Sequence, residues 1–288
     1  MSVAPQQTQP GFALLNNWAR PRARAENSPR ALIPQTLLQI NRLLVRWRRD
    51  QTMVILTLAV PILFLLTLNT VLGQRISQIT GHSALSGSVP MIAVVAAITG
   101  SAAGAVGLMR ERADGLLARL WVLPVHRASG GLSRLAAEAV RVFVTTVLIL
   151  CAGLVLGFRF HQGPLAALAW LTVPVIFGVA FATLVTTVAF YSAAGSSQPF
   201  TTLVEGITLV PTLGLFFCTG FVPLRQYPRW IQPAVEHQPM SYAIEAMRGL
   251  SQGGPIAWPM TATLLWAGGT VAACIVPMVL GYRKASTR

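Results

Sequence analysis

The residues that could do chemistry in this chain are few and scattered. Nucleotide hydrolysis at a P-loop needs a glycine-rich loop that ends in lysine followed by serine or threonine. The only lysine among the 288 residues is Lys284, and an alanine follows it. The histidines, His82, His126, His161 and His237, are isolated, and no HExxH motif of a metalloprotease occurs. We therefore expect the chain not to be an enzyme and to bind no cofactor itself.

Glu205 is the one acidic residue that the sequence places inside an apolar run. Ion-coupled transporters carry ionisable side chains near the bilayer midplane, which makes Glu205 a candidate for a transport path. At about four residues into its helix it would lie only about 6 Å deep, at ~1.5 Å per residue. Thr202 and Glu205 also fit a capping box, S/T-x-x-E, so a structural role is the open alternative.

Much of the remaining charge lies in one stretch, from Arg110 to Arg141, between two long apolar runs. This stretch holds six arginines together with Glu111, Asp114 and Glu138. Residues Glu111–Trp121 can form a short helix with one apolar face, which Pro124 would end. Such a helix is suited to a groove on a cytoplasmic partner. A solvated basic loop that only sets membrane topology is the alternative.

The second half of this stretch predicts the start of another helix. Its apolar residues recur at helical spacing from Leu132 to Phe143 and form one face. Arg134 and Glu138, spaced i,i+4, are expected to pair on the opposite face. The next apolar run therefore belongs to a helix that begins well before the run itself.

Composition indicates that lipid surrounds most of this chain. Only 10% of the residues are charged, against about 25% in an ordinary soluble domain. Apolar runs long enough to cross a bilayer core of roughly 30 Å recur along the sequence. The net charge of +14 would suit nucleic acid, but the arginines cluster beside the apolar runs, so no nucleic-acid partner is expected. We predict an all-α membrane protein.

The apolar runs predict six transmembrane helices. They cover Thr52–Leu72, Val89–Met109, Val142–Phe158, Leu165–Tyr191, Thr201–Val222 and Pro259–Tyr282. The segments outside them carry seventeen basic residues on the side of both termini and five on the other side. The positive-inside rule then places both termini in the cytoplasm of a multi-pass protein of the cell membrane. Residues 1–30 predict a disordered cytoplasmic tail, and residues 31–288 one transmembrane domain.

Three shorter features complete the expected architecture. Residues Ile33–Trp47 predict a two-faced basic helix in the membrane interface, although packing on protein is an alternative. Gly100 and Gly104 form a GxxxG motif, which would let two helices approach closely. Residues Pro239–Leu250 predict a short helix ahead of the last span.

Five segments resemble the ABC-2 type permeases, the membrane subunits of ABC exporters. They read QTLLQINRLL, MRERADGLLARLWVLPVHRASG, VLGFRFHQG, CTGFVPL and HQPMSYAIEAMRG. Among these permeases they are most similar to the daunorubicin/doxorubicin resistance permeases of actinobacteria, in particular the mycobacterial subfamily. The likeness covers roughly Pro34 to Arg288 and leaves out the N-terminal tail.

The resemblance implies roles for three of the predicted helices. Ile33–Trp47 would be the interface helix, Glu111–Trp121 a coupling helix, and Pro239–Leu250 a re-entrant helical segment on the outer side. It further implies a separate ATP-binding subunit, which would hold ATP and Mg²⁺, and either a second ABC-2 permease or another copy of this chain. The residues that match the coupling positions are Glu111, Gly115, Arg119, Pro124 and Arg127.

The cargo implied by the resemblance is apolar: a polyketide-derived envelope lipid such as phthiocerol dimycocerosate, or an anthracycline drug. On the residues alone, two other classes of protein stay open. An ion-driven multidrug exporter would lose export in a protonophore while ATP is held constant. A non-transporting scaffold for a lipid synthase would leave cargo outside the cell unchanged when the ATP-binding partner is catalytically dead.

Overall fold

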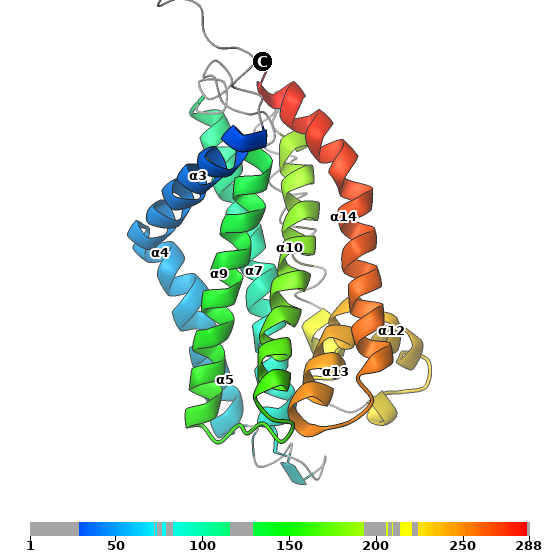
Figure 1. The fold of residues 1–288 in the computed structure, drawn as a ribbon. Coiled ribbons are helices and arrows are strands. Elements are labelled where there is room, and N and C mark those ends of the chain that lie inside the picture. The colour runs from blue at the N-terminus through cyan, green and yellow to red at the C-terminus, as the bar shows by residue number, and fades with distance from the viewer. Residues whose placement is uncertain are drawn as a thin grey trace, which may run out of the picture.

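The computed structural model describes residues 29–71, 83–115, 129–192, 214–220 and 224–286, together with positions 73, 77, 78, 206 and 209. Every regular element in this part of the chain is a helix, as predicted. Figure 1 shows long helices standing side by side in a bundle: α7 (Leu85–Ala113), α9 (Ser129–Val155), α10 (Pro164–Ser192) and α14 (Ala257–Ser286). A further rod consists of α4 (Gln51–Val54), the π-helix η1 (Ile55–Ala59) and α5 (Val60–Val71).

Five helical rods within the described residues are long and apolar enough to cross a membrane. They are Gln51–Val71, Leu85–Glu111, Ser129–Val155, Pro164–Tyr191 and Ala257–Gly281. These correspond to five of the six predicted spans. The remaining one, Thr201–Val222, lies mostly outside the described residues, as does nearly all of the predicted tail over residues 1–30. The third predicted span does begin early, because α9 starts at Ser129 and not at Val142.

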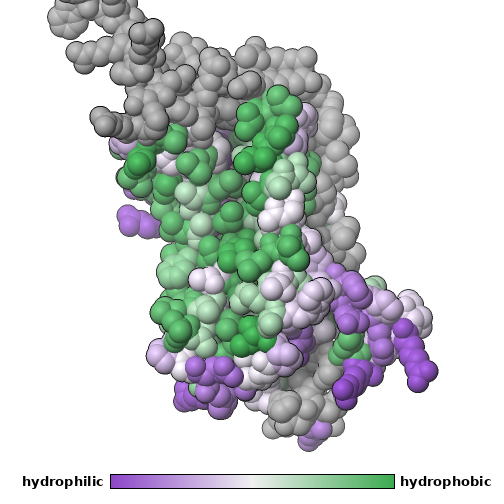
Figure 2. Space-filling view, turned by 45° about the vertical axis from the view of Figure 1, so that its right-hand side comes forward, coloured by the Kyte–Doolittle hydropathy of each residue, from purple (hydrophilic) through white to green (hydrophobic). Residues whose placement is uncertain are grey.

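Helix α7 forms the centre of the bundle. In its most apolar window 61% of the residues are buried, against 22% in the α4–α5 rod and in α14. It packs against α9, α10, α5 and the short helix α13. Its fully buried side chains include Val89, Met91, Ile92 and Val94. The outer rods instead expose leucine, isoleucine and valine, and Figure 2 shows hydrophobic side chains over the middle of one face.

Helix α9 turns its polar side inward. Leu132, Val140 and Phe143, members of the predicted apolar face, are exposed, whereas Glu138 and Arg141 are buried. Lipid tails are as apolar as leucine, so burying an apolar face brings no hydrophobic gain inside a membrane. Polar side chains must find partners there, and protein supplies them. This orientation brings the charges of α9 into the interior of the bundle.

Helix α3 (Pro29–Arg49) precedes the first rod and covers the predicted Ile33–Trp47 helix. Asp50 separates the two, because its backbone is extended and its carboxylate accepts a hydrogen bond from the Met53 amide at 3.1 Å. This N-cap restarts the helix in a new direction. Figure 1 shows α3 slanting across α9, against which it packs. That α3 lies in a membrane interface stays a prediction.

Short helices gather at the end of the bundle opposite the α7 C-terminus. They are η2 (Leu215–Phe217), η3 (Leu224–Gln226), α12 (Gln232–His237) and α13 (Pro239–Gln252). A helix over Pro239–Leu250 is therefore confirmed, while its re-entrant character stays a prediction. Arg248 of α13 donates to the Thr219 carbonyl oxygen at 2.7 Å and ties the preceding loop to α13. Helix α14 then returns to the end where α3 begins (Figure 1).

Candidate functional site: charged residues at the Arg-rich end

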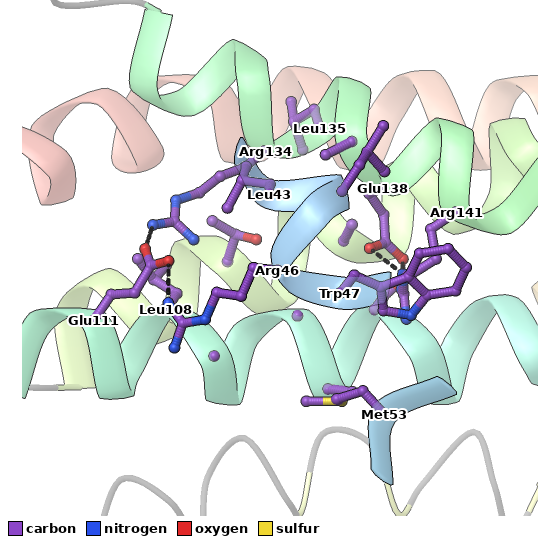
Figure 3. A pocket seen from close by; sticks show the side chains of 18 of the residues that line it. Leu43, Arg46, Trp47, Met53, Leu108, Glu111, Arg134, Leu135, Glu138 and Arg141 are labelled. Atoms are coloured by element: carbon purple, nitrogen blue, oxygen red, sulfur yellow. Dashed lines mark hydrogen bonds and ion pairs between the residues drawn. The ribbon is translucent and has the colours of Figure 1, made fainter. Parts of the chain in front are cut away.

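We call the end of the bundle where α7 ends and α9 begins the Arg-rich end. There Glu111, near the C-terminus of α7, joins three helices. Its carboxylate accepts from Nη1 of Arg46 on α3 at 2.7 Å, and its second oxygen accepts from Nη2 of Arg134 on α9. Glu111 is only 3% exposed, whereas the Arg134 side chain is 12% and that of Arg46 53% exposed. Figure 3 shows both arginines reaching Glu111 from opposite sides.

We call Glu111 with its partners Arg46 and Arg134 the Glu111 node. A second contact joins α3 to α9 near this node. Gln39 of α3 donates from Nε2 to the hydroxyl of Ser129 at 3.1 Å, and its Oε1 accepts from the hydroxyl of Ser133, also at 3.1 Å. An amide that is satisfied on both its donor and its acceptor side fixes the rotation of both helices. Together with Glu111, it makes α3 and the paired ends of α7 and α9 one connected unit.

A second ion pair lies deeper in the bundle. Arg141 donates from Nε to Oε2 of Glu138 at 3.1 Å and from Nη2 to Oε1, and both side chains are 8–9% exposed. The Ser101 hydroxyl of α7 reaches Glu138 Oε1 at 2.8 Å. Ser101 is ten residues from Glu111, which is about 15 Å along a helix. A charged pair of α9 therefore lies against α7, and both helices are long and apolar enough to span a membrane.

This arrangement corrects two expectations from the sequence. The predicted Arg134–Glu138 pair is wrong, because Arg134 turns to Glu111 and Glu138 turns to Arg141. The expectation that Glu205 is the one acidic residue inside an apolar stretch is also wrong, since Glu138 lies inside the Ser129–Val155 rod. The sequence contained a signal for the Glu138–Arg141 pair. The two residues carry opposite charges at i,i+3 spacing, a separation at which side chains meet on one helix face.

The GxxxG motif of α7 receives this pair. A methyl group at Gly100 would lie between 2.5 and 2.8 Å from the guanidinium atoms of Arg141, and one at Gly104 would lie 3.5 Å from Oε2 of Glu138. The absence of a side chain at Gly100 therefore leaves room for a close contact between α7 and α9. The charged side chains Arg141 and Glu138 of α9 lie against these glycines, and the closest approach is that of Arg141 to Gly100.

We expect Gly100→Ala to destabilise the protein by about 1–3 kcal/mol, because Glu138 holds the Arg141 guanidinium against the position of the new methyl group. Gly104→Ala is the matched control. Its methyl group would make an ordinary contact, and alanine gains up to about 1 kcal/mol over glycine within a helix. Thermal unfolding in detergent measures both variants. Equal midpoints for the two would contradict the packing described here.

The other candidate positions are described only in part. Gly115 lies in the turn after α7, with φ of +69°, a backbone conformation that favours glycine. Arg119, Pro124, Arg127 and Glu205 fall outside the described residues. The predicted Glu111–Trp121 helix is described only over its first five residues, of which Glu111, Arg112 and Ala113 belong to the end of α7 and the other two to a turn. Sequence reasoning did not single out Arg46, Ser101 or Arg141.

A cavity of about 150 Å³ opens between α3, α7, α9 and α10 at this site (Figure 3). Both ion pairs line it, and Leu43, Trp47 and Leu108 supply apolar walls. A second cavity, of about 320 Å³, lies between the α4–α5 rod and α7. Among the described residues, no three His, Cys, Asp or Glu side chains are grouped so that they could hold a metal ion.

A family model and individual relatives all show that the chain is similar to ABC transporter permeases. The family model described as ABC-2 type transporter matches residues 34–250. The probable doxorubicin resistance ABC transporter permease protein DrrC of Mycobacterium tuberculosis is 54% identical over 263 residues, which are 91% of this chain and 93% of that protein. The daunorubicin resistance ABC transporter permease protein DrrB1 of Streptomyces coeruleorubidus is 24% identical over 241 residues, 83% of each chain. No solved structure matches the chain significantly.

Proposed function

Because this chain belongs to the ABC-2 type transporter family, we propose that it is the membrane-spanning permease subunit of an ATP-driven exporter in the cell membrane. The observation that carries the proposal is the Glu111 node, which joins α3, α7 and α9 at the point where the Arg-rich stretch leaves the bundle. A push on that stretch would reach three helices at once. Such an arrangement suits a subunit that receives motion and performs no chemistry.

The partner that supplies the motion would be a separate ATP-binding subunit, which binds ATP and Mg²⁺. It would contact the loop after α7, where Gly115, Arg119, Pro124 and Arg127 match the coupling positions of the family. This assignment puts the Arg-rich end and both termini in the cytoplasm, in keeping with the positive-inside rule. A second permease, or a second copy of this chain, would complete the transport path, with lipid around the remaining surface.

The cargo we propose is apolar. Two observations support this: the relatives above are named for resistance to doxorubicin and daunorubicin, and the α4–α5 rod and α14 expose mainly apolar side chains. An envelope polyketide lipid such as phthiocerol dimycocerosate and an anthracycline drug both fit. Transport would leave the cargo chemically unchanged, since nucleotide hydrolysis happens on the partner.

An ion-coupled exporter is the second candidate, because Glu138 is a carboxylate inside an apolar rod. Proton relays use such residues. Here both oxygens of Glu138 accept from Arg141, and one also meets the Ser101 hydroxyl. With both oxygens already occupied by these donors, Glu138 suits a structural pair better than a proton carrier. The protonophore test at constant ATP separates the two functions.

The proposal is tested by co-purification in mild detergent followed by ATPase and export assays. We expect a soluble P-loop ATPase to accompany the chain, and Arg119→Glu to lower both cargo-stimulated ATPase activity and export by about tenfold or more, as loss of a charged interface contact does. Arg225→Glu, an equal charge reversal in the exposed η3 at the opposite end, should change neither. A chain that purifies alone and exports in ATP-depleted cells would refute the proposal.

A further inference from the structure

Two cavities adjoin along α7, and they differ in chemistry. The first is the cavity at the Arg-rich end that both ion pairs line. The second is lined mainly by apolar and small side chains, among them Leu56, Phe64 and Ile92. Met53 and Ala103 line both cavities. A single molecule with a polar end and an apolar tail would therefore find a place for each part without leaving the bundle.

The charged cavity has spare hydrogen-bond donors and almost no spare acceptors. Both oxygens of Glu111 and both of Glu138 already accept from arginine. One oxygen of Asp50 caps the Met53 amide.

On the donor side, the Nη1 group of Arg141 meets no acceptor within the part of the chain that the structure describes. Arg46 and Arg134 each use one nitrogen in the hydrogen bonds found there. Arg110 also lines the cavity, is exposed, and has no ion pair within the described residues. Four arginines against three carboxylates leave this cavity positively charged.

We propose that the two cavities form one binding site for a membrane phospholipid with an anionic headgroup. The phosphate enters the arginine-lined cavity, and one acyl chain lies along α7 in the apolar cavity. Guanidinium groups pair with phosphate through two parallel hydrogen bonds, and arginine N–H groups of this cavity that are not engaged by a carboxylate can donate them. Basic pockets between transmembrane helices are sites where acidic lipid headgroups bind. Binding of this lipid does not itself require nucleotide-driven transport.

Residues that line each of the two cavities support this assignment. Leu56 and Thr57 belong to the π-helix η1, and both line the apolar cavity. A π-helix widens the local backbone and occurs often at functional sites. Trp47 lines the charged cavity together with Arg141. Tryptophan is enriched at the depth of lipid headgroups.

Native mass spectrometry of the purified full-length chain tests the headgroup. We expect one phosphatidylglycerol per chain, bound about tenfold or more tighter than phosphatidylcholine with the same acyl chains. The double variant Arg46→Gln and Arg110→Gln should lose that preference. The control Arg42→Gln and Arg49→Gln removes the same charge from exposed positions of α3 that do not line the cavity, and should keep it. Equal binding of the two lipids, or equal loss in both double variants, would overturn the proposal.

A second pair of variants tests the acyl chain. Ala103→Leu fills the junction of the two cavities, whereas Ala102→Leu places the same side chain on a neighbouring residue that lines neither. We expect phosphatidylglycerol binding to weaken by about tenfold in the first variant and to stay unchanged in the second. Inorganic phosphate serves as the headgroup-only probe. If it bound as tightly as the lipid, the apolar cavity would play no part and the proposal would fail.

Discussion

Glu138→Ala is expected to lower the stability of the protein by about 3–5 kcal/mol, because it leaves Arg141 buried without its counter-charge. The Arg141 side chain is only 8% exposed, and the guanidinium lies against Gly100 with no room to move toward α7. In a chain of this size, the loss corresponds to a fall of about 10 °C or more in the midpoint of thermal unfolding. Thermal unfolding in detergent, read by tryptophan fluorescence, measures it.

Two controls separate the loss of the ion pair from the loss of a side chain. Glu138→Leu combined with Arg141→Met removes both charges at similar volume and should recover most of the stability, since replacing a whole buried pair is often neutral. Glu245→Ala breaks a pair with the same i,i+3 spacing, Glu245–Arg248, that is 27–38% exposed. It should cost less than about 1 kcal/mol. A Glu138→Ala protein as stable as Glu245→Ala would contradict a buried pair.

The sequence predicts which helices exist much better than how they meet. Apolar runs identify five rods that the structure confirms, because a bilayer of fixed thickness demands long uncharged stretches. Apolar character alone would start the third span at Val142, since a charged pair looks like the end of a membrane segment, and only the helical spacing from Leu132 to Phe143 predicted the earlier start of the helix. In the structure the charges of Glu138 and Arg141 neutralise each other, so α9 runs through them as one helix.

The Glu111 node shows a different limit. Its partners lie 65 residues before it, in Arg46, and 23 residues after it, in Arg134. No local period links positions so far apart, and the i,i+4 rule favoured a pairing within α9 that does not form. The small residues of α7 gave a partial signal, because Arg141 approaches the α7 backbone closely at Gly100. The small residues alone do not predict that a charged side chain of α9 makes this contact.

Glu111→Ala is expected to be the second severe variant. The residue lies near the C-terminal end of α7, where the helix dipole disfavours a negative charge. Two arginines offset this penalty, and one of them, Arg134, would stay largely buried without a partner. We expect a loss of about 3 kcal/mol for Glu111→Ala. For Arg46→Ala we expect less than about 1 kcal/mol, because Arg46 is half-exposed and Glu111 would keep Arg134.

Arg134→Ala should fall between these two values, since Glu111 would then keep only the half-exposed Arg46. Hydrogen exchange gives a second readout: in Glu111→Ala the amides of α3 should lose protection, because α3 then loses its link through Glu111 and keeps its contacts through Gln39 and packing. Asp114→Ala is the matched control, an exposed acid three residues later with no ion pair within the described part of the chain. If Arg46→Ala lowered the stability as much as Glu111→Ala, the node would not be a buried carboxylate shared by two arginines. Motion at the Arg-rich end would then have to reach the three helices through other contacts.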